Sequence, residues 1–98
     1  MAATRDVAGR RYAAAVLAIA RQEGSLDGWV TAMDALESLT QRPEFVAALQ
    51  GDGMTDERFQ AIVRRVAPAV TPVQMNLFRL LRRKARLGLG ADIASFFR

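Results

Sequence analysis

The sequence contains no cysteine and no histidine among its 98 residues. These two absences exclude cysteine-based nucleophilic catalysis, imidazole acid–base chemistry and the usual zinc sites. The carboxylates are scattered along the chain, and no two of them stand out as an acid and base pair. We therefore expect a protein that is not an enzyme, with no cofactor and no metal ion.

Aromatic residues are also scarce, at 7% of the chain, although 51% of its residues are apolar and alanine and leucine are common. This composition favours closely packed helices over a β-sandwich, whose strands prefer aromatic and β-branched side chains. A chain of 98 residues can bury one modest core without disulfides or metal ions. We predict an all-α fold, a compact helical bundle that forms one domain over residues 1–98.

Long hydrophobic runs are absent as well. The longest, Tyr12 to Ala20 within "RRYAAAVLAIARQEG", has about half of the roughly 20 residues that a membrane-spanning helix needs. No signal-type cleavage site follows it, so we expect a protein that stays in the compartment in which it is made. The net charge of +4 does not choose between nucleic acid, anionic lipid and an acidic protein as a partner.

Apolar periodicity and helix-boundary residues predict six helices and no strand. The helices span about residues 4–23, 26–41, 43–50, 56–67, 72–87 and 91–97. The clearest start is "TPVQ", where Thr71 is the N-cap, Pro72 the first helical residue and Gln74 the partner that completes a capping box. Thr55 is a second N-cap, and two acids follow it in the first turn.

Two further patterns have a structural and a functional interpretation. "GLGAD", residues 88–92, contains two glycines but follows no strand, so it indicates a turn between helices and not a phosphate-binding loop. In "RLLRRKARL" four arginines share one side of the expected helix: Arg79, Arg82, Arg83 and Arg86. Such a row can contact phosphates, or it can be a solvated face whose last cations suit the negative end of the helix dipole. No aromatic residue lies between the arginines as a stacking platform for bases.

The first expected helix is apolar over more of its circumference than one core contact requires. At about 100° per residue, one stripe contains Ala8, Tyr12, Ala15 and Ile19, and a second contains Ala13, Leu17 and Ala20. Val16 lies between the stripes, and together they cover an arc of about 200°. One side of this arc can meet the core, and the other needs a different partner.

The fifth expected helix repeats this pattern. Val73, Leu77 and Leu80 form one apolar edge, and a second edge contains Phe78, Leu81 and Ala85. Small alanines on one helix beside leucines on the other would leave a shallow apolar groove, the usual receptor for an amphipathic partner helix. The alternative is that both are central core helices, and periodicity alone does not choose between them.

Several motifs resemble those of a known family in the same order. They are "RRYAAAVLAIA", "LDGWV", "PEFVAAL", "NLFRLL" followed by "RL", and "DIASFF". From Val7 to Phe97 the chain is similar to the N-terminal domain of the delta subunit of bacterial F-type ATP synthase, equivalent to the mitochondrial oligomycin-sensitivity-conferring protein. The resemblance implies a six-helix bundle on top of the catalytic head, with a groove between the first and fifth helices.

In that family the groove binds N-terminal helices of the alpha subunits, so the resemblance implies a noncatalytic stator connector. Matched by position, the partner-binding residues are Tyr12, Ala15 and Leu80. Helical geometry extends the set to Ala8, Ile19 and Asn76. The resemblance further implies a peripheral place on the cytoplasmic side of the bacterial inner membrane, with only indirect membrane contact and no nucleic acid.

The chain departs from the family pattern in two ways. Where the family commonly has an acidic or asparagine-glycine stretch before "RL", this chain has "RRKARL". The family's C-terminal region, which engages the b subunit of the peripheral stalk, is absent from the 98 residues, so we expect residues 1–98 to be the N-terminal domain of such a subunit. The alternative function is a small, basic, helical nucleic-acid-binding domain that uses the arginine row.

Overall fold

The computed structural model describes the backbone of residues 2–97 and the side chains of residues 7–97. This part of the chain is helical and has no strand. The elements in chain order are α1 (Ala2–Glu23), α2 (Leu26–Thr40), α3 (Pro43–Gln50), α4 (Asp56–Val66), α5 (Pro72–Arg83), the 3-10 turn η1 (Leu87–Leu89) and α6 (Gly90–Phe97). The predicted all-α bundle of six helices is confirmed.

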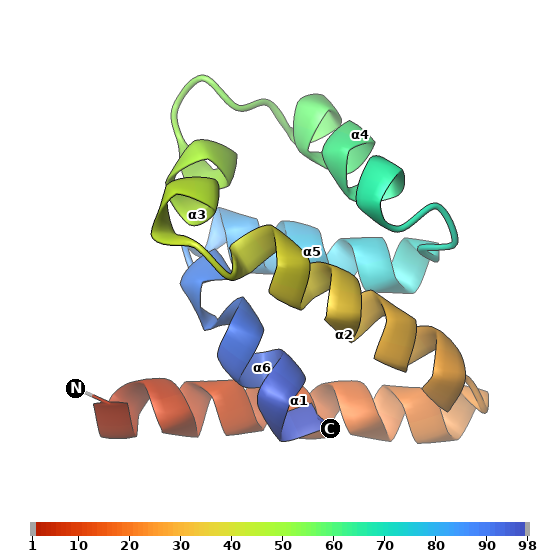
Figure 1. Cartoon of the computed structure of the whole chain (residues 1–98). Helices are drawn as coiled ribbons and strands as arrows, with labels where there is room; N and C mark the ends of the chain where they lie inside the picture. The colour runs from red at the N-terminus through yellow and green to blue at the C-terminus, as the bar shows by residue number, and fades with distance from the viewer. Residues whose placement is uncertain (1, 98) are drawn as a thin grey trace.

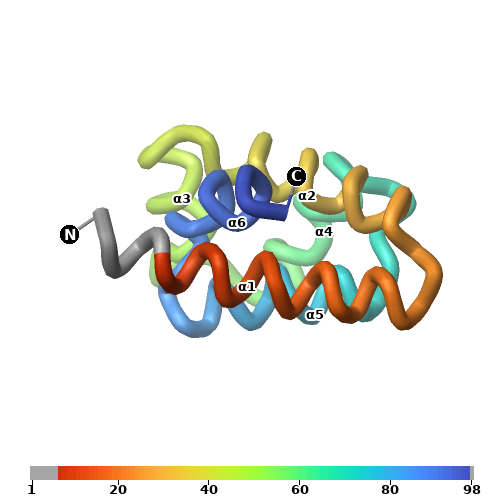
Figure 2. Tube along the Cα trace, turned by 90° about the horizontal axis from the view of Figure 1, so that it is seen from below, coloured from red at the N-terminus to blue at the C-terminus, as the bar shows by residue number. Residues whose placement is uncertain are grey.

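Helix α1 lies along one side of the bundle and is longer than the other helices (Figure 1). Helix α6 packs against both α1 and α2, so the first and last helices lie together. Figures 1 and 2 show α5 running in the opposite direction to α1. The beginning of α1 is therefore at the same end of the molecule as the end of α5.

Two glycines allow α6 to approach its neighbours closely. A Cβ atom at Gly90 would lie 2.3 Å from Oγ1 of Thr40 in α2. A Cβ atom at Gly9 of α1 would lie 3.2 Å from Cβ of Asp92 and 3.2 Å from the ring of Phe96 in α6. A larger residue at Gly90 would force the helices apart, because packed interiors leave little space for added atoms.

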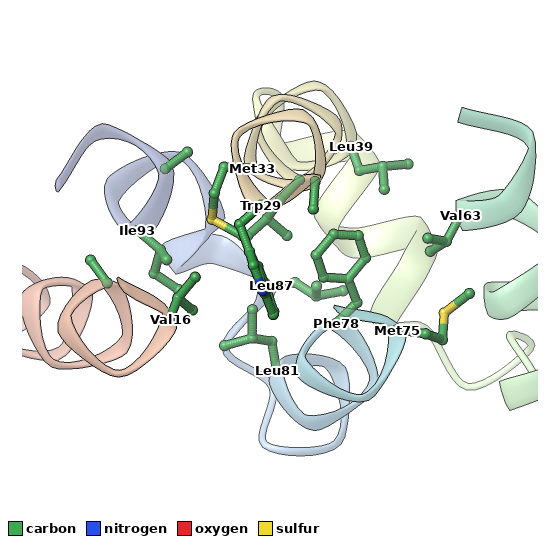
Figure 3. Close-up of a cluster of buried hydrophobic side chains, with 14 of the residues drawn as sticks. Val16, Trp29, Met33, Leu39, Val63, Met75, Phe78, Leu81, Leu87 and Ile93 are labelled. Atoms are coloured by element: carbon green, nitrogen blue, oxygen red, sulfur yellow. The ribbon is translucent and has the colours of Figure 1, made fainter. Parts of the chain in front are cut away.

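The core lies where α1, α2, α5 and α6 converge (Figure 3). Trp29 of α2 is at its centre, with Val16 of α1 and Ile93 of α6 on one side and Phe78 of α5 on the other. Trp29, Phe78 and Ile93 are each no more than 1% exposed. Burial of a large apolar side chain contributes about 1.5–3 kcal/mol, so Trp29 has a structural role in the core.

The helix boundaries follow local chemistry in most places. The side chain of Thr71 accepts a hydrogen bond from the backbone N–H of Gln74, and the Gln74 side chain accepts one from the backbone N–H of Thr71. This is the predicted capping box. Thr55 caps α4 by accepting from the backbone N–H of Arg58. Gly24 has a φ of +67°, which lets the chain reverse between α1 and α2.

Helix α5 ends earlier than the sequence predicts. It stops at Arg83 and not at Leu87, because Ala85 has a φ of +54°. The N–H of Ala85 donates to the carbonyl of Arg82, and the N–H of Arg86 donates to the carbonyl of Leu81, at 3.0 and 2.7 Å. These two bonds form a Schellman motif, a helix ending that normally has glycine at the position of Ala85. Ala85 is consequently exposed and not part of the apolar arc.

Two side chains expected in the core stripe of α2 lie instead at the surface. The sequence places Leu26 and Val30 in one stripe with Trp29 and Met33, but Leu26 is 44% and Val30 is 40% exposed. Trp29 and Met33 point into the core. The apolar stripe of α2 is therefore wider than the part of the surface of α2 that the neighbouring helices cover.

We expect Ala85→Gly to stabilise the fold. Alanine in the left-handed region is strained, whereas glycine adopts the same backbone conformation at no steric cost, so the gain is about 1 kcal/mol. Thermal unfolding followed by circular dichroism measures it. Ala18→Gly in the exposed face of α1 is the control and should destabilise, since glycine inside a helix costs about 0.5–1 kcal/mol. A lower melting temperature for Ala85→Gly would contradict this account of the helix end.

Candidate protein-binding face

The structure separates the two predicted stripes of α1. Ala13, Val16 and Ala20 are buried, at no more than 4% exposure, and belong to the core. The other stripe stays at the surface: Ala15 is exposed, and the remaining members, Ala8, Tyr12 and Ile19, are partly buried. The wide apolar arc of α1 therefore has one side in the core and one side that the rest of the described chain covers only in part.

Helix α5 divides in the same way. Phe78 and Leu81 are fully buried, whereas Val73 and Leu80 are 41% and 40% exposed. Leu77 is partly buried and packs against the core from the side. The two predicted edges of α5 thus have different environments, and the edge that contains Leu80 reaches solvent.

A hydrogen bond connects these two surfaces. Nη1 of Arg86, just after α5, donates to the hydroxyl of Tyr12 in α1 over 2.9 Å. It joins the middle of α1 to the segment that follows α5. We call the surface with these side chains the α1–α5 face: Ala8, Tyr12, Ala15, Ile19, Val73, Leu77 and Leu80.

Asn76, the remaining predicted site residue, lies towards α4. It is exposed and lines a shallow hollow with residues of α4 and of the start of α5, among them Gln60, Arg64 and Arg79. At about 100° per residue, Asn76 is displaced from Leu77 by one residue around α5, away from the core side. The structure therefore brings Tyr12 and the end of α5 together but places Asn76 at the outer edge.

Two members of the arginine row make contacts inside the protein. Arg82 donates from Nε to the carbonyl of Leu49 over 2.8 Å and from Nη2 to the carbonyl of Met54 over 2.6 Å. Its guanidinium also lies 5.6 Å from the ring centroid of Phe59. Arg82 thus ties the segment between α3 and α4 to α5. An arginine with these contacts is not available to phosphates, which weakens the basis for nucleic-acid binding.

Arg79 forms an ion pair with Asp56 at the start of α4. Nη2 of Arg79 is 2.9 Å from Oδ2 of Asp56, and Nε donates to Oδ1 over 3.1 Å. The Arg79 hydrogen bond is the main cause that lowers the pKa of Asp56 from its ordinary value of 3.8, with help from Gln60 and opposed by partial burial. The pair holds α4 against α5.

The residues that the structure describes contain no group of three or more acidic side chains placed to hold a metal ion. Within the same part of the chain, no helix combines the length and apolar character needed to cross a membrane. What the site residues present is an apolar surface with a polar end, which suits contact with another polypeptide.

Comparison with known proteins identifies the family of the chain. The family model of the ATP synthase delta (OSCP) subunit matches residues 8–98. The chain belongs to this family. The ATP synthase subunit delta of Chlorobium phaeobacteroides strain BS1 is 33% identical over 93 residues, which are 93% of this chain and 52% of that protein. This delta-family chain therefore spans about half the length of the relative that it matches.

Family membership confirms the resemblance seen in the sequence. The matched residues begin at Ala8, the first member of the α1–α5 face, and include all of α5. Sequence reasoning identified the apolar members of this face but missed the Tyr12–Arg86 hydrogen bond. These residues are 74 positions apart in the chain, and no local pattern links them.

We expect Asp56→Asn to lower the melting temperature at pH 7 but not at pH 2. The pKa of Asp56 is lowered in the folded chain, so folding favours the ionised carboxylate. Its contribution is present above about pH 4 and is lost as the pH falls through the lowered pKa. Melting curves of both proteins from pH 7 to pH 2 test this, and Asp52→Asn, in an exposed turn, is the control. A gap between the curves that does not change with pH would contradict the role of the ion pair.

Proposed function

We propose that this chain is a noncatalytic connector in the stator of ATP synthase. Its α1–α5 face binds the N-terminal helix of an alpha subunit in a groove between α1 and α5. The observation that carries the proposal is the partly exposed apolar stripe on α1, together with the exposed Val73 and Leu80 on α5, in a chain of the delta family. An apolar surface of this kind on a small domain is typical of a protein interface.

The shapes of the side chains suit a helix as the occupant. Ala8 and Ala15 project only a methyl group, so a partner backbone can approach α1 closely. Tyr12 and Ile19 on one side and Leu80 on the other provide larger walls. An amphipathic helix presents apolar side chains at three- and four-residue spacing, which is the spacing of the α1 stripe itself.

The proposed role in the complex is mechanical. By binding alpha subunits, the domain would keep the catalytic head from rotating during proton-driven ATP synthesis. The connection to the b subunit of the peripheral stalk would use the C-terminal region of a full-length delta subunit. The domain would then lie on the cytoplasmic side of the bacterial inner membrane and contact the membrane only through the complex.

Calorimetric titration with a synthetic peptide of the cognate alpha-subunit N-terminus tests the proposal. We expect one peptide per domain, with a negative heat-capacity change because apolar surface is buried. Trp29 fluorescence gives a second readout if docking changes the environment of the core. Absence of heat over the whole range up to millimolar peptide would overturn the proposed function.

Ala15→Asp should weaken this binding at least about tenfold while the domain stays folded. Ala15 is exposed, so the carboxylate is hydrated in the free domain and the melting temperature should change little. In the complex the same carboxylate would lose its water without gaining a partner, a penalty of several kcal/mol against a micromolar affinity of about 8 kcal/mol. Peptide calorimetry and thermal melting measure the two effects separately.

Ala14→Asp is the matched control, because Ala14 is also exposed and points about 100° away from Ala15 around α1, outside the stripe. It should bind the peptide like the original chain. Equal loss of binding in both variants would show that added charge, and not its position, is responsible. A large fall in the melting temperature of Ala15→Asp would mean that this position is part of the core.

A further inference from the structure

We propose that the partner helix docks in one direction, with its carboxylates at the end of the α1–α5 face formed by Arg83, Lys84 and Arg86. This inference rests on the proposed function and adds the chemistry and the orientation of the partner. It comes from the distribution of charge along the face, which differs sharply between its two ends. We call the end with these three residues the cationic end.

The three side chains of the cationic end are exposed, and one of them, Arg86, is held beside α1. Arg83 follows Leu80 by three residues, less than one turn beyond the face, and lies close enough to Asp56 of α4 to help lower the pKa of that carboxyl. Arg86 is fixed beside α1 by its 2.9 Å hydrogen bond to the hydroxyl of Tyr12. A guanidinium has five N–H donors, so a bond from one nitrogen to a neutral hydroxyl leaves capacity for a carboxylate.

Helix α1 adds a fourth cation to this end. Arg11 is exposed and precedes Tyr12 in the chain. At about 100° per residue it lies roughly 40° from Ala15 and 60° from Ala8 around the helix, at the solvent edge of the α1 stripe. The cationic end therefore has positive side chains on both helices that border the face.

The opposite end of the face has fewer positive side chains. The exposed residues there are Gln22 and Glu23 of α1 and Val73 and Asn76 of α5, and Arg64 of α4 lines the hollow beside Asn76. Arg21 is close in sequence but lies on the other side of α1 from Tyr12 and Ile19. The charge along the face thus runs from strongly positive beside Tyr12 to neutral or negative beside Glu23.

The helix dipole alone does not require this arrangement. Cations in a last turn suit the negative end of a helix, which accounts for Arg83. Arg86 follows the left-handed turn at Ala85, and its side chain extends to Tyr12 of α1. The dipole of α5 therefore does not account for the position of Arg86. Complementary charge at the rim of an apolar interface fixes orientation and speeds association, so a partner with carboxylates at one end would dock one way round.

The test uses the cognate alpha-subunit peptide and a version of it in which every Glu and Asp is replaced by Gln or Asn. The original chain should bind the first peptide about tenfold more tightly than the second at 50 mM salt, and the difference should shrink at 500 mM salt. The double variant Arg83→Glu/Lys84→Glu should lose a similar factor for the first peptide and little for the second. Arg58→Glu/Arg65→Glu, with the same charge change on exposed positions of α4, should leave binding unchanged.

The orientation has its own readout. With a nitroxide label at the carboxylate-rich end of the peptide, the amide signals of Tyr12 and Arg86 should broaden in the NMR spectrum more strongly than the signal of Glu23, which lies about 16 Å from Tyr12 along α1. This measurement needs no variant of the protein, so it holds even where a charge reversal impairs folding. Broadening beside Glu23 instead, or equally at both ends, would overturn the proposed direction.

The outcomes separate this inference from the proposed function. Failure of both peptides to bind the original chain at any salt concentration would overturn the proposed function and, with it, this inference. Equal binding of both peptides, without salt dependence, would overturn the proposed role of the cationic end but leave the proposed function standing. Random-sequence duplex DNA bound as tightly as the peptide, and lost in Arg83→Glu/Lys84→Glu, would assign this end to phosphates and overturn the inference.

Discussion

Helix α6 can lie against both α1 and α2 only because glycine occupies a point of close approach on each side. Gly90 meets Thr40 of α2, and Gly9 of α1 meets the base of Asp92. This double contact brings Ile93 against Val16 and Trp29, so the centre of the core depends on it (Figure 3). Because α6 covers one side of α1, the side with Ala15 stays uncovered, and the proposed binding surface follows from the way the core is packed.

The sequence predicted most of the fold because most helix boundaries are decided by neighbouring residues. The capping box at Thr71 and the reversal at Gly24 involve only a few consecutive positions. The end of α5 was missed for the same reason: apolar periodicity continues to Leu87, and alanine does not signal a left-handed turn. The bonds that Leu81 and Arg82 accept there, and the hydrogen bond from the Leu87 N–H to the Gln50 side chain, are visible only in three dimensions.

The candidate site was predicted in part. A period of 3.6 residues identifies the stripes of α1, but it does not say which of them meets the core. The contact of Gly9 with α6 decides this, and it depends on residues more than 80 positions away. The same limit applies to the arginines. The sequence placed Arg86 on one side of the fifth helix with Arg79 and Arg82, but α5 ends at Arg83, and Arg86 turns to Tyr12 of α1. The partners of the other two, Asp56 for Arg79 and the backbone near α3 for Arg82, come from other parts of the chain.

The hydrogen bonds of Arg82 hold the segment before α4, and acid does not change the charge of this arginine. Arginine keeps its charge at every pH at which proteins are studied, so its bonds to the carbonyls of Leu49 and Met54 persist where Asp56 becomes protonated. The end of α3 and the start of α4 are therefore secured by contacts with different sensitivities to acid. Below about pH 4, as Asp56 becomes protonated, local opening should begin at the first turn of α4 and spare the segment beneath Arg82, so this small domain loses its structure in stages that hydrogen exchange can resolve.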